Sequence, residues 1–93
     1  MMAESKTRID RQNRTISRIH RIQGQLAALE RAIEADKDCE YRVTQALAIE
    51  KAVSSLTRHM LEGYIEHRAR ARIQSDPEAT LDEIKRLFAL MLR

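Results

Sequence analysis

The chain contains one cysteine, Cys39, whose type and position permit reactive chemistry. It follows a polar break at residues 35–38 and stands between Asp38 and Glu40, so we expect it at the exposed start of a helix. Unpaired backbone N–H groups and the positive end of the helix dipole stabilise a thiolate at such a position, although the neighbouring acids oppose this effect. Cys39 is therefore a candidate nucleophile or ligand, and a small buried apolar residue is the alternative.

Basic residues concentrate near the beginning of the chain and form a ridge there. Four arginines recur at spacings of 3, 4 and 3, which places them along one side of a helix over roughly 15 Å. Each guanidinium offers a planar fork of donors that suits phosphate oxygens. Like charges at these spacings repel one another, and a bound polyanion such as DNA or RNA would offset that repulsion. The alternative is an ordinary helix face exposed to solvent. The basic ridge consists of Arg11, Arg14, Arg18 and Arg21.

Other site patterns are missing from the sequence. It has no zinc-finger spacing, no compact helix-turn-helix, no glycine-rich phosphate loop and no serine elbow. His20, His59 and His67 do not pair at i, i+4, and no Cys-x-x-Cys is present. We therefore expect no enzyme, no cofactor and no metal site within one chain. A metal site formed between subunits, with Cys39 and either His67 or His59, stays open.

The elements that must position these residues are helices. Apolar periodicity predicts a first helix from about Lys6 or Ile9 to Ala35 and a second from Cys39 to about Ile73. Asp38 is the expected N-cap of the second helix, and Thr80 with Glu83 has capping-box spacing for a third. The sequence thus predicts an all-α fold with two long antiparallel helices and a short C-terminal helix.

The second helix is apolar on more than one side. A helix with two apolar sides in a chain of 93 residues predicts burial within an oligomer, because so short a chain buries a limited core. One stripe contains Ala46, Ile49, Val53, Leu56 and Met60, and Val43, Leu47 and Leu61 lie off it.

Composition limits the class of protein further. Charge is high but nearly balanced, with 17 basic and 14 acidic residues and a net charge of +3. A single cysteine allows no intrachain disulfide, and no secretory signal or apolar run approaching the ~20 residues of a membrane span is visible. We expect one cytoplasmic domain over residues 1–93, with residues 1–7 as a flexible arm.

The run from Arg18 to Glu34, Arg-Ile-His-Arg-Ile-Gln-Gly-Gln-Leu-Ala-Ala-Leu-Glu-Arg-Ala-Ile-Glu, followed by Asp38-Cys39, resembles the CsoR/RcnR/FrmR family of bacterial repressors. Residues 61–66, Leu-Glu-Gly-Tyr-Ile-Glu, are similar to the family's second helix, and the resemblance covers nearly the whole chain. The family includes copper, nickel or cobalt, sulfur and formaldehyde sensors. The resemblance implies a homotetramer, a dimer of antiparallel dimers, that binds operator DNA across a flat basic face and releases it when a site near the Cys is occupied.

The sequence departs from the family at the sensor positions. In the family's metal sensors a His, and then a His or Cys one turn later, join the Cys from the partner subunit. Here Tyr64 and Arg68 occupy those positions; a phenol is a poor ligand for copper(I) or nickel, and a guanidinium is none. Sulfur sensors carry a second Cys where this chain has Tyr64, whereas formaldehyde sensors need only the Cys and a nearby N-terminal amine.

Three hypotheses follow. The first is a repressor of double-stranded operator DNA that senses an electrophile such as formaldehyde at Cys39, beside Tyr64 and Arg68, through condensation with the amine of Met1, Met2 or Ala3. The second is a metal-sensing repressor with an unusual ligand set. The third is a helical interaction module whose basic face binds an acidic protein.

Overall fold

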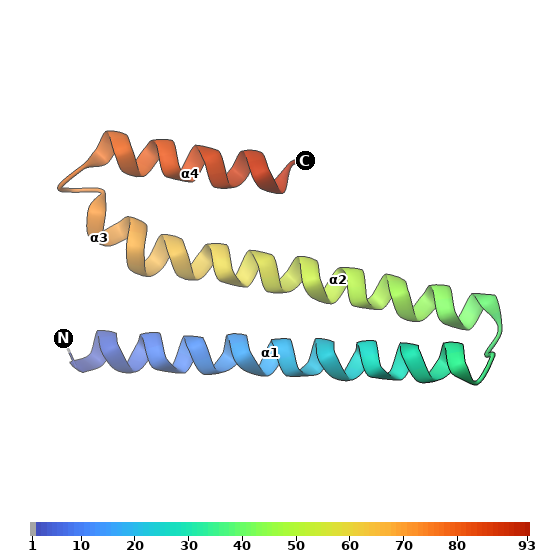
Figure 1. The fold of residues 1–93 in the computed structure, drawn as a ribbon. Coiled ribbons are helices and arrows are strands. Elements are labelled where there is room, and N and C mark those ends of the chain that lie inside the picture. Colours follow the sequence, from blue (N-terminus) through green and yellow to red (C-terminus); the bar gives the residue numbers. More distant parts are fainter. Residues whose placement is uncertain (1) are drawn as a thin grey trace. The chain divides into compact units, whose positions relative to one another are not determined.

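The computed structural model describes the backbone of residues 2–93 and the side chains of residues 7–93. It is 89% helical, with no strand among these residues. The elements are α1 (Met2–Glu34), α2 (Cys39–Gly63), the π-helical segment η1 (Tyr64–Ala69), the short α3 (Arg70–Arg72) and α4 (Pro77–Met91), as Figure 1 shows. The all-α class and the arrangement of two long helices and a short one are confirmed.

Contacts divide the chain into two compact units, Met1–Met60 and Leu61–Arg93, and each is described by itself. The first unit holds α1 and most of α2; the second holds η1, α3 and α4. Helix α1 begins at Met2, earlier than the periodicity predicted. The side chains of residues 1–6, which make up most of the predicted flexible arm and include the candidate amine donors, lie outside the described residues.

The turn between α1 and α2 is formed by hydrogen bonds that end one helix and begin the next. Asp36 adopts a left-handed conformation with a φ of 53°, and the Lys37 and Asp36 N–H groups donate to the Ala32 and Ile33 carbonyls at 2.9 and 3.1 Å. This is the Schellman pattern, with Asp in the place where glycine is commonest. The Tyr41 N–H then donates to Asp38 Oδ1 at 2.8 Å, so the predicted N-cap is confirmed.

Within the first unit, α1 and α2 run antiparallel, side by side (Figure 1). The residues of α1 that pack toward α2 are half-buried or buried, and they recur along the helix at spacings of 4 and 3. Ile22 and Ala32 are its buried apolar residues, and Ile49 is their buried counterpart on α2. This packing face is unusually polar: it consists of Arg11, Thr15, Arg18, Ile22, Gln25, Leu29 and Ala32.

The apolar residues of α1 therefore divide into two groups. The periodicity that predicts this helix rests on a stripe of six residues, Ile16, Ile19, Ile22, Leu26, Leu29 and Ile33, of which only Ile22 and Leu29 belong to the packing face. The other four and Ile9 are 37–55% exposed and form a second row, which we call the apolar row: Ile9, Ile16, Ile19, Leu26 and Ile33. At about 100° per residue, this row lies on one side of the packing face, and Arg14 and Arg21 lie on the other.

The second unit is a helical hairpin in which α4 returns against η1 and α3. Helix α4 begins at Pro77, with Asp76 as its N-cap and the Ala79 N–H donating to Asp76 Oδ1 at 3.3 Å. The predicted capping box of Thr80 and Glu83 is wrong, because an Asp cap followed by proline at the first helical position starts the helix earlier. Thr80 is instead fully buried, and its hydroxyl donates to the Asp76 carbonyl at 2.7 Å.

Candidate functional site

The four arginines of the basic ridge have two different environments. Arg11 and Arg18 are half-buried and hold α1 to α2. Arg11 Nη2 donates to the His59 carbonyl at 2.8 Å, and Arg18 Nη1 donates to Ser55 Oγ at 3.0 Å. Arg14 and Arg21 are exposed. Arg14 and Arg21 are therefore accessible to a ligand, whereas Arg11 and Arg18 also form hydrogen bonds that join α1 to α2.

A buried histidine links α2 to α1. His59 is 8% exposed, and its Nε2 lies 2.8 Å from Thr15 Oγ1. The Thr15 hydroxyl donates to the Arg11 carbonyl at 2.9 Å, so Nε2 carries a proton and donates to Thr15. Sequence reasoning treated His59 only as a possible metal ligand, because a pairing between residues 44 apart has no local signal. In the structure its Nε2 is already engaged within the chain.

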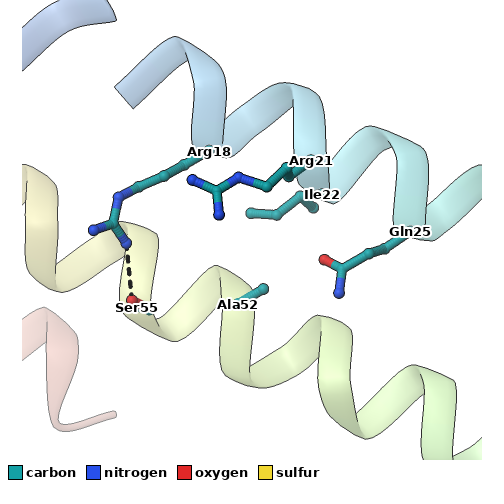
Figure 2. Close-up of a pocket in the computed structure, with 6 residues that line it drawn as sticks. All are labelled: Arg18, Arg21, Ile22, Gln25, Ala52 and Ser55. Atoms are coloured by element: carbon teal, nitrogen blue, oxygen red, sulfur yellow. Dashed lines mark hydrogen bonds between the residues drawn. The ribbon is translucent and has the colours of Figure 1, made fainter. Parts of the chain in front are cut away.

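A pocket of about 400 Å³ lies between α1 and α2, next to the Arg18–Ser55 hydrogen bond. Figure 2 shows Arg18 and Gln25 extending from α1 toward α2, and Arg21 extending along α1 toward Arg18. Ile22, Ala52 and Ser55 complete the lining. Sequence reasoning missed this pocket, because Gln25, Ala52 and Ser55 carry no motif and meet only through the packing of the two helices.

Cys39 is a free, exposed thiol at the first position of α2. Its predicted place at an exposed helix start is confirmed, and the alternative of a buried packing residue is wrong. Because the thiol is open to solvent and is held on the rigid start of a helix, a small electrophile can reach it from outside.

Tyr64 and Arg68 lie in the second unit, within η1. A π-helical segment inside a longer helix is rare and frequently marks a functional site. The Tyr64 hydroxyl is buried next to the Glu83 carboxylate, although the geometry falls short of a formed hydrogen bond. Burial raises the pKa of Tyr64, and the adjacent Glu83 raises it further, so the phenol stays neutral at neutral pH.

Glu83 connects Tyr64 to a cation. Its carboxylate accepts a hydrogen bond from Arg72 Nη1 at 2.8 Å in an ion pair. The interaction with the Tyr64 hydroxyl is the largest cause that lowers the pKa of Glu83, and Arg72, Arg68 and Arg86 lower it further. Tyr64, Glu83 and the surrounding arginines thus form a polar cluster around an ionised carboxylate.

Replacing this carboxylate gives a pH-dependent loss of stability. Because its folded pKa lies below the ordinary 4.5, Glu83 stabilises the fold above that pH and loses its effect as pH falls through the folded value. We expect Glu83→Gln to have a lower melting temperature than the wild type at pH 7, and the difference to disappear as the pH falls through the folded pKa of Glu83. Thermal unfolding followed by circular dichroism measures this. Asp82→Asn, at an exposed acid of the same helix, is the control; a Glu83→Gln deficit that persists in acid would contradict the assignment.

The donor set does not match a metal site of the expected kind. Among the described residues, no group of three or more His, Cys, Asp or Glu side chains could hold a metal ion. The two positions expected to complete a site carry Tyr64, whose phenol stays neutral, and Arg68, which cannot coordinate. One further donor exists: His67 Nε2 is buried without a hydrogen-bond partner.

No helix in the described part of the chain has the length and apolar character needed to cross a membrane.

Comparison with known proteins agrees with these features. A family model described as "metal-sensitive transcriptional repressor" matches residues 11–90. The chain is also similar to a Serratia marcescens protein named only as an uncharacterized protein in the bioA 5' region. The two are 35% identical over 81 residues, which is 86% of this chain and 87% of that protein. No solved structure matches the chain.

Proposed function

Since the chain belongs to the family of metal-sensitive transcriptional repressors, which is not a class of enzymes, we propose that it binds operator DNA as a homotetramer and releases it when an electrophile such as formaldehyde reacts at Cys39. The observation that carries the proposal is the combination of exposed arginines on α1 with an exposed lone thiol that lacks the expected metal-ligand partners.

The arginines support DNA binding through phosphates. Arg14 and Arg21 stand on the same side of α1, and the hydrogen bonds of Arg11 and Arg18 to α2 hold that helix in place. A rigid row of guanidinium groups positions a protein on the duplex backbone without reading bases. Operator choice then rests on the shape of the DNA as well as on any base contacts.

The DNA hypothesis is tested by the salt dependence of affinity. We expect binding to a duplex selected from a random-sequence pool to weaken by about 0.9 log unit per phosphate contact for each tenfold rise in salt concentration. Fluorescence anisotropy at several salt concentrations gives the slope. Failure to bind any duplex at low salt would favour the protein-interaction module instead.

The apolar row supports assembly with further copies. Its five residues stay 37–55% exposed in a single chain, and residues such as Leu47 and Met60 on α2 are exposed as well. Several large apolar side chains exposed along one helix are costly in water and favour an interaction surface. The row lies on the other side of the packing face from Arg14 and Arg21, so copies that associate through it leave those arginines uncovered.

Placing a charge in the apolar row should therefore break the assembly. We expect Leu26→Glu to shift the wild-type oligomer to smaller species, because a buried carboxylate without a partner is strongly unfavourable. Ser17→Glu, at an exposed position about 180° around α1 from Leu26, faces away from the row and should leave the oligomer intact. Sedimentation velocity at micromolar concentration measures both; a wild-type monomer there would contradict the proposal.

A metal-sensing role is the second candidate, and one observation favours it. His67 Nε2 is buried without a hydrogen-bond partner, and neutral imidazole is a common metal ligand. In a site formed between subunits, Cys39 of one copy and His67 of another would supply two ligands, so further ligands would have to come from elsewhere. Metal-induced release that is lost in His67→Gln would support this candidate over the electrophile.

A further inference from the structure

We propose that the pocket between α1 and α2 binds a phosphate group. Its lining contains the guanidinium groups of Arg18 and Arg21, the amide of Gln25 and the hydroxyl of Ser55, above the apolar side chains of Ile22 and Ala52 (Figure 2).

The chemistry of the lining selects for an oxyanion. Every polar residue of the pocket can donate a hydrogen bond, and none carries a carboxylate. Ser55 Oγ accepts from Arg18 Nη1 at 3.0 Å, and its own O–H can donate to another acceptor. Two guanidinium groups that line the same pocket repel each other, and a phosphate between them would remove that cost while accepting paired N–H donors.

The scaffold makes the pocket rigid. Ile22 is buried, and Arg18 is held to α2 through Ser55, so part of the binding geometry exists before the ligand arrives. Its volume of about 400 Å³ lies within the usual range of small-ligand sites, which gives room for a phosphate with an attached ester group. Both a phosphate of the DNA backbone and a free phosphorylated molecule satisfy this chemistry. Binding of a DNA phosphate rests on the proposed function, whereas binding of a free phosphorylated molecule does not.

The pocket is tested with inorganic phosphate on the full chain. Phosphate replaces chloride at constant ionic strength, and NMR follows the backbone amides and the Gln25 side-chain amide. We expect saturable shifts around the pocket in the wild type and in Arg14→Ala. Arg21→Ala should weaken phosphate binding by about tenfold or more, as expected when a charge-assisted hydrogen bond is removed. Ser55→Ala, which keeps both arginines, should weaken it by a smaller factor.

Two results would contradict phosphate binding in the pocket. One is the absence of saturation, and the other is an equal reduction in Arg14→Ala and Arg21→Ala, since a diffuse positive field does not distinguish the two arginines. Repeating the titration on the DNA complex identifies the source. Loss of the phosphate response assigns the pocket to a backbone phosphate, and an unchanged response assigns it to a free phosphorylated ligand. If the chain binds no DNA, the proposed function fails, while the first titration still decides the pocket.

Discussion

Reversing the two exposed arginines, in the double variant Arg14→Glu/Arg21→Glu, should weaken DNA binding by at least about a hundredfold at moderate salt. Both side chains are exposed, and neither contributes to the Arg11–His59 and Arg18–Ser55 hydrogen bonds that hold α1 to α2. The double variant should therefore keep its helical content and melting temperature. The slope of log affinity against log salt should also fall by at least about 1.8, because each phosphate that an arginine no longer neutralises lowers it by about 0.9.

A control with the same change in net charge separates this effect from general repulsion. Lys85→Glu/Arg93→Glu replaces exposed cations outside the basic ridge and should weaken binding far less. Fluorescence anisotropy on one selected duplex compares the variants, and circular dichroism checks their folding. Full binding by Arg14→Glu/Arg21→Glu, or equal weakening in both double variants, would show that α1 does not present the DNA-binding surface.

The second large effect concerns Cys39. Removing the thiol in Cys39→Ala should abolish release by formaldehyde and leave DNA affinity unchanged in its absence. The thiol is exposed at the start of α2, and no second cysteine is present in the sequence to replace it. The thiolate adds to formaldehyde to give an S-hydroxymethyl group, and a nearby amine then displaces water to leave an S–CH2–N bridge. One carbon is added, a gain of about 12 Da, and no oxidant is needed.

Peptide mass spectrometry identifies the amine. From the sequence we expect an N-terminal α-amino group, because at a typical pKa of about 8 a fraction of it is neutral at pH 7. Because the 33 residues of α1 separate the beginning of the chain from Cys39 by about 50 Å, the bridge must join the beginning of one copy to α2 of another. Such a bridge would displace the arginines of α1 from their phosphates. Release of Cys39→Ala at the same formaldehyde concentration as the wild type would exclude Cys39 as the sensor.

Local signals in the sequence predicted most of the helices. Asp38 caps α2 as expected. An N-cap is predictable from sequence because its side chain accepts a hydrogen bond from a backbone N–H only two or three residues ahead. The predicted start of α4 was wrong, because the sequence offers two acceptable N-caps, Asp76 and Thr80, only four residues apart. The structure uses Asp76 and buries Thr80, and local sequence does not reveal that burial. The π-helical register of η1 has no periodicity signal in the sequence, so it was not predicted.

The candidate site was predictable only in part. Apolar periodicity found a stripe on α1, but the packing face within the chain is largely polar, with Arg11, Thr15, Arg18 and Gln25 among its members. A search for apolar residues cannot identify such a face. The ridge of four arginines was visible from spacing, whereas its division into two anchored and two exposed side chains depends on His59 and Ser55, far away in the sequence.

We propose that an electrophile that reacts with the Cys39 thiol, and not a metal ion, controls DNA binding by this family member. The direct measurement is anisotropy of the wild-type protein–DNA complex challenged separately with formaldehyde, copper(I), nickel and cobalt. We predict release by formaldehyde, with one bridge per copy by mass spectrometry, and no release by any of the metals at stoichiometric concentration. Stoichiometric binding of a metal with loss of DNA affinity, while formaldehyde leaves the complex intact, would contradict the account.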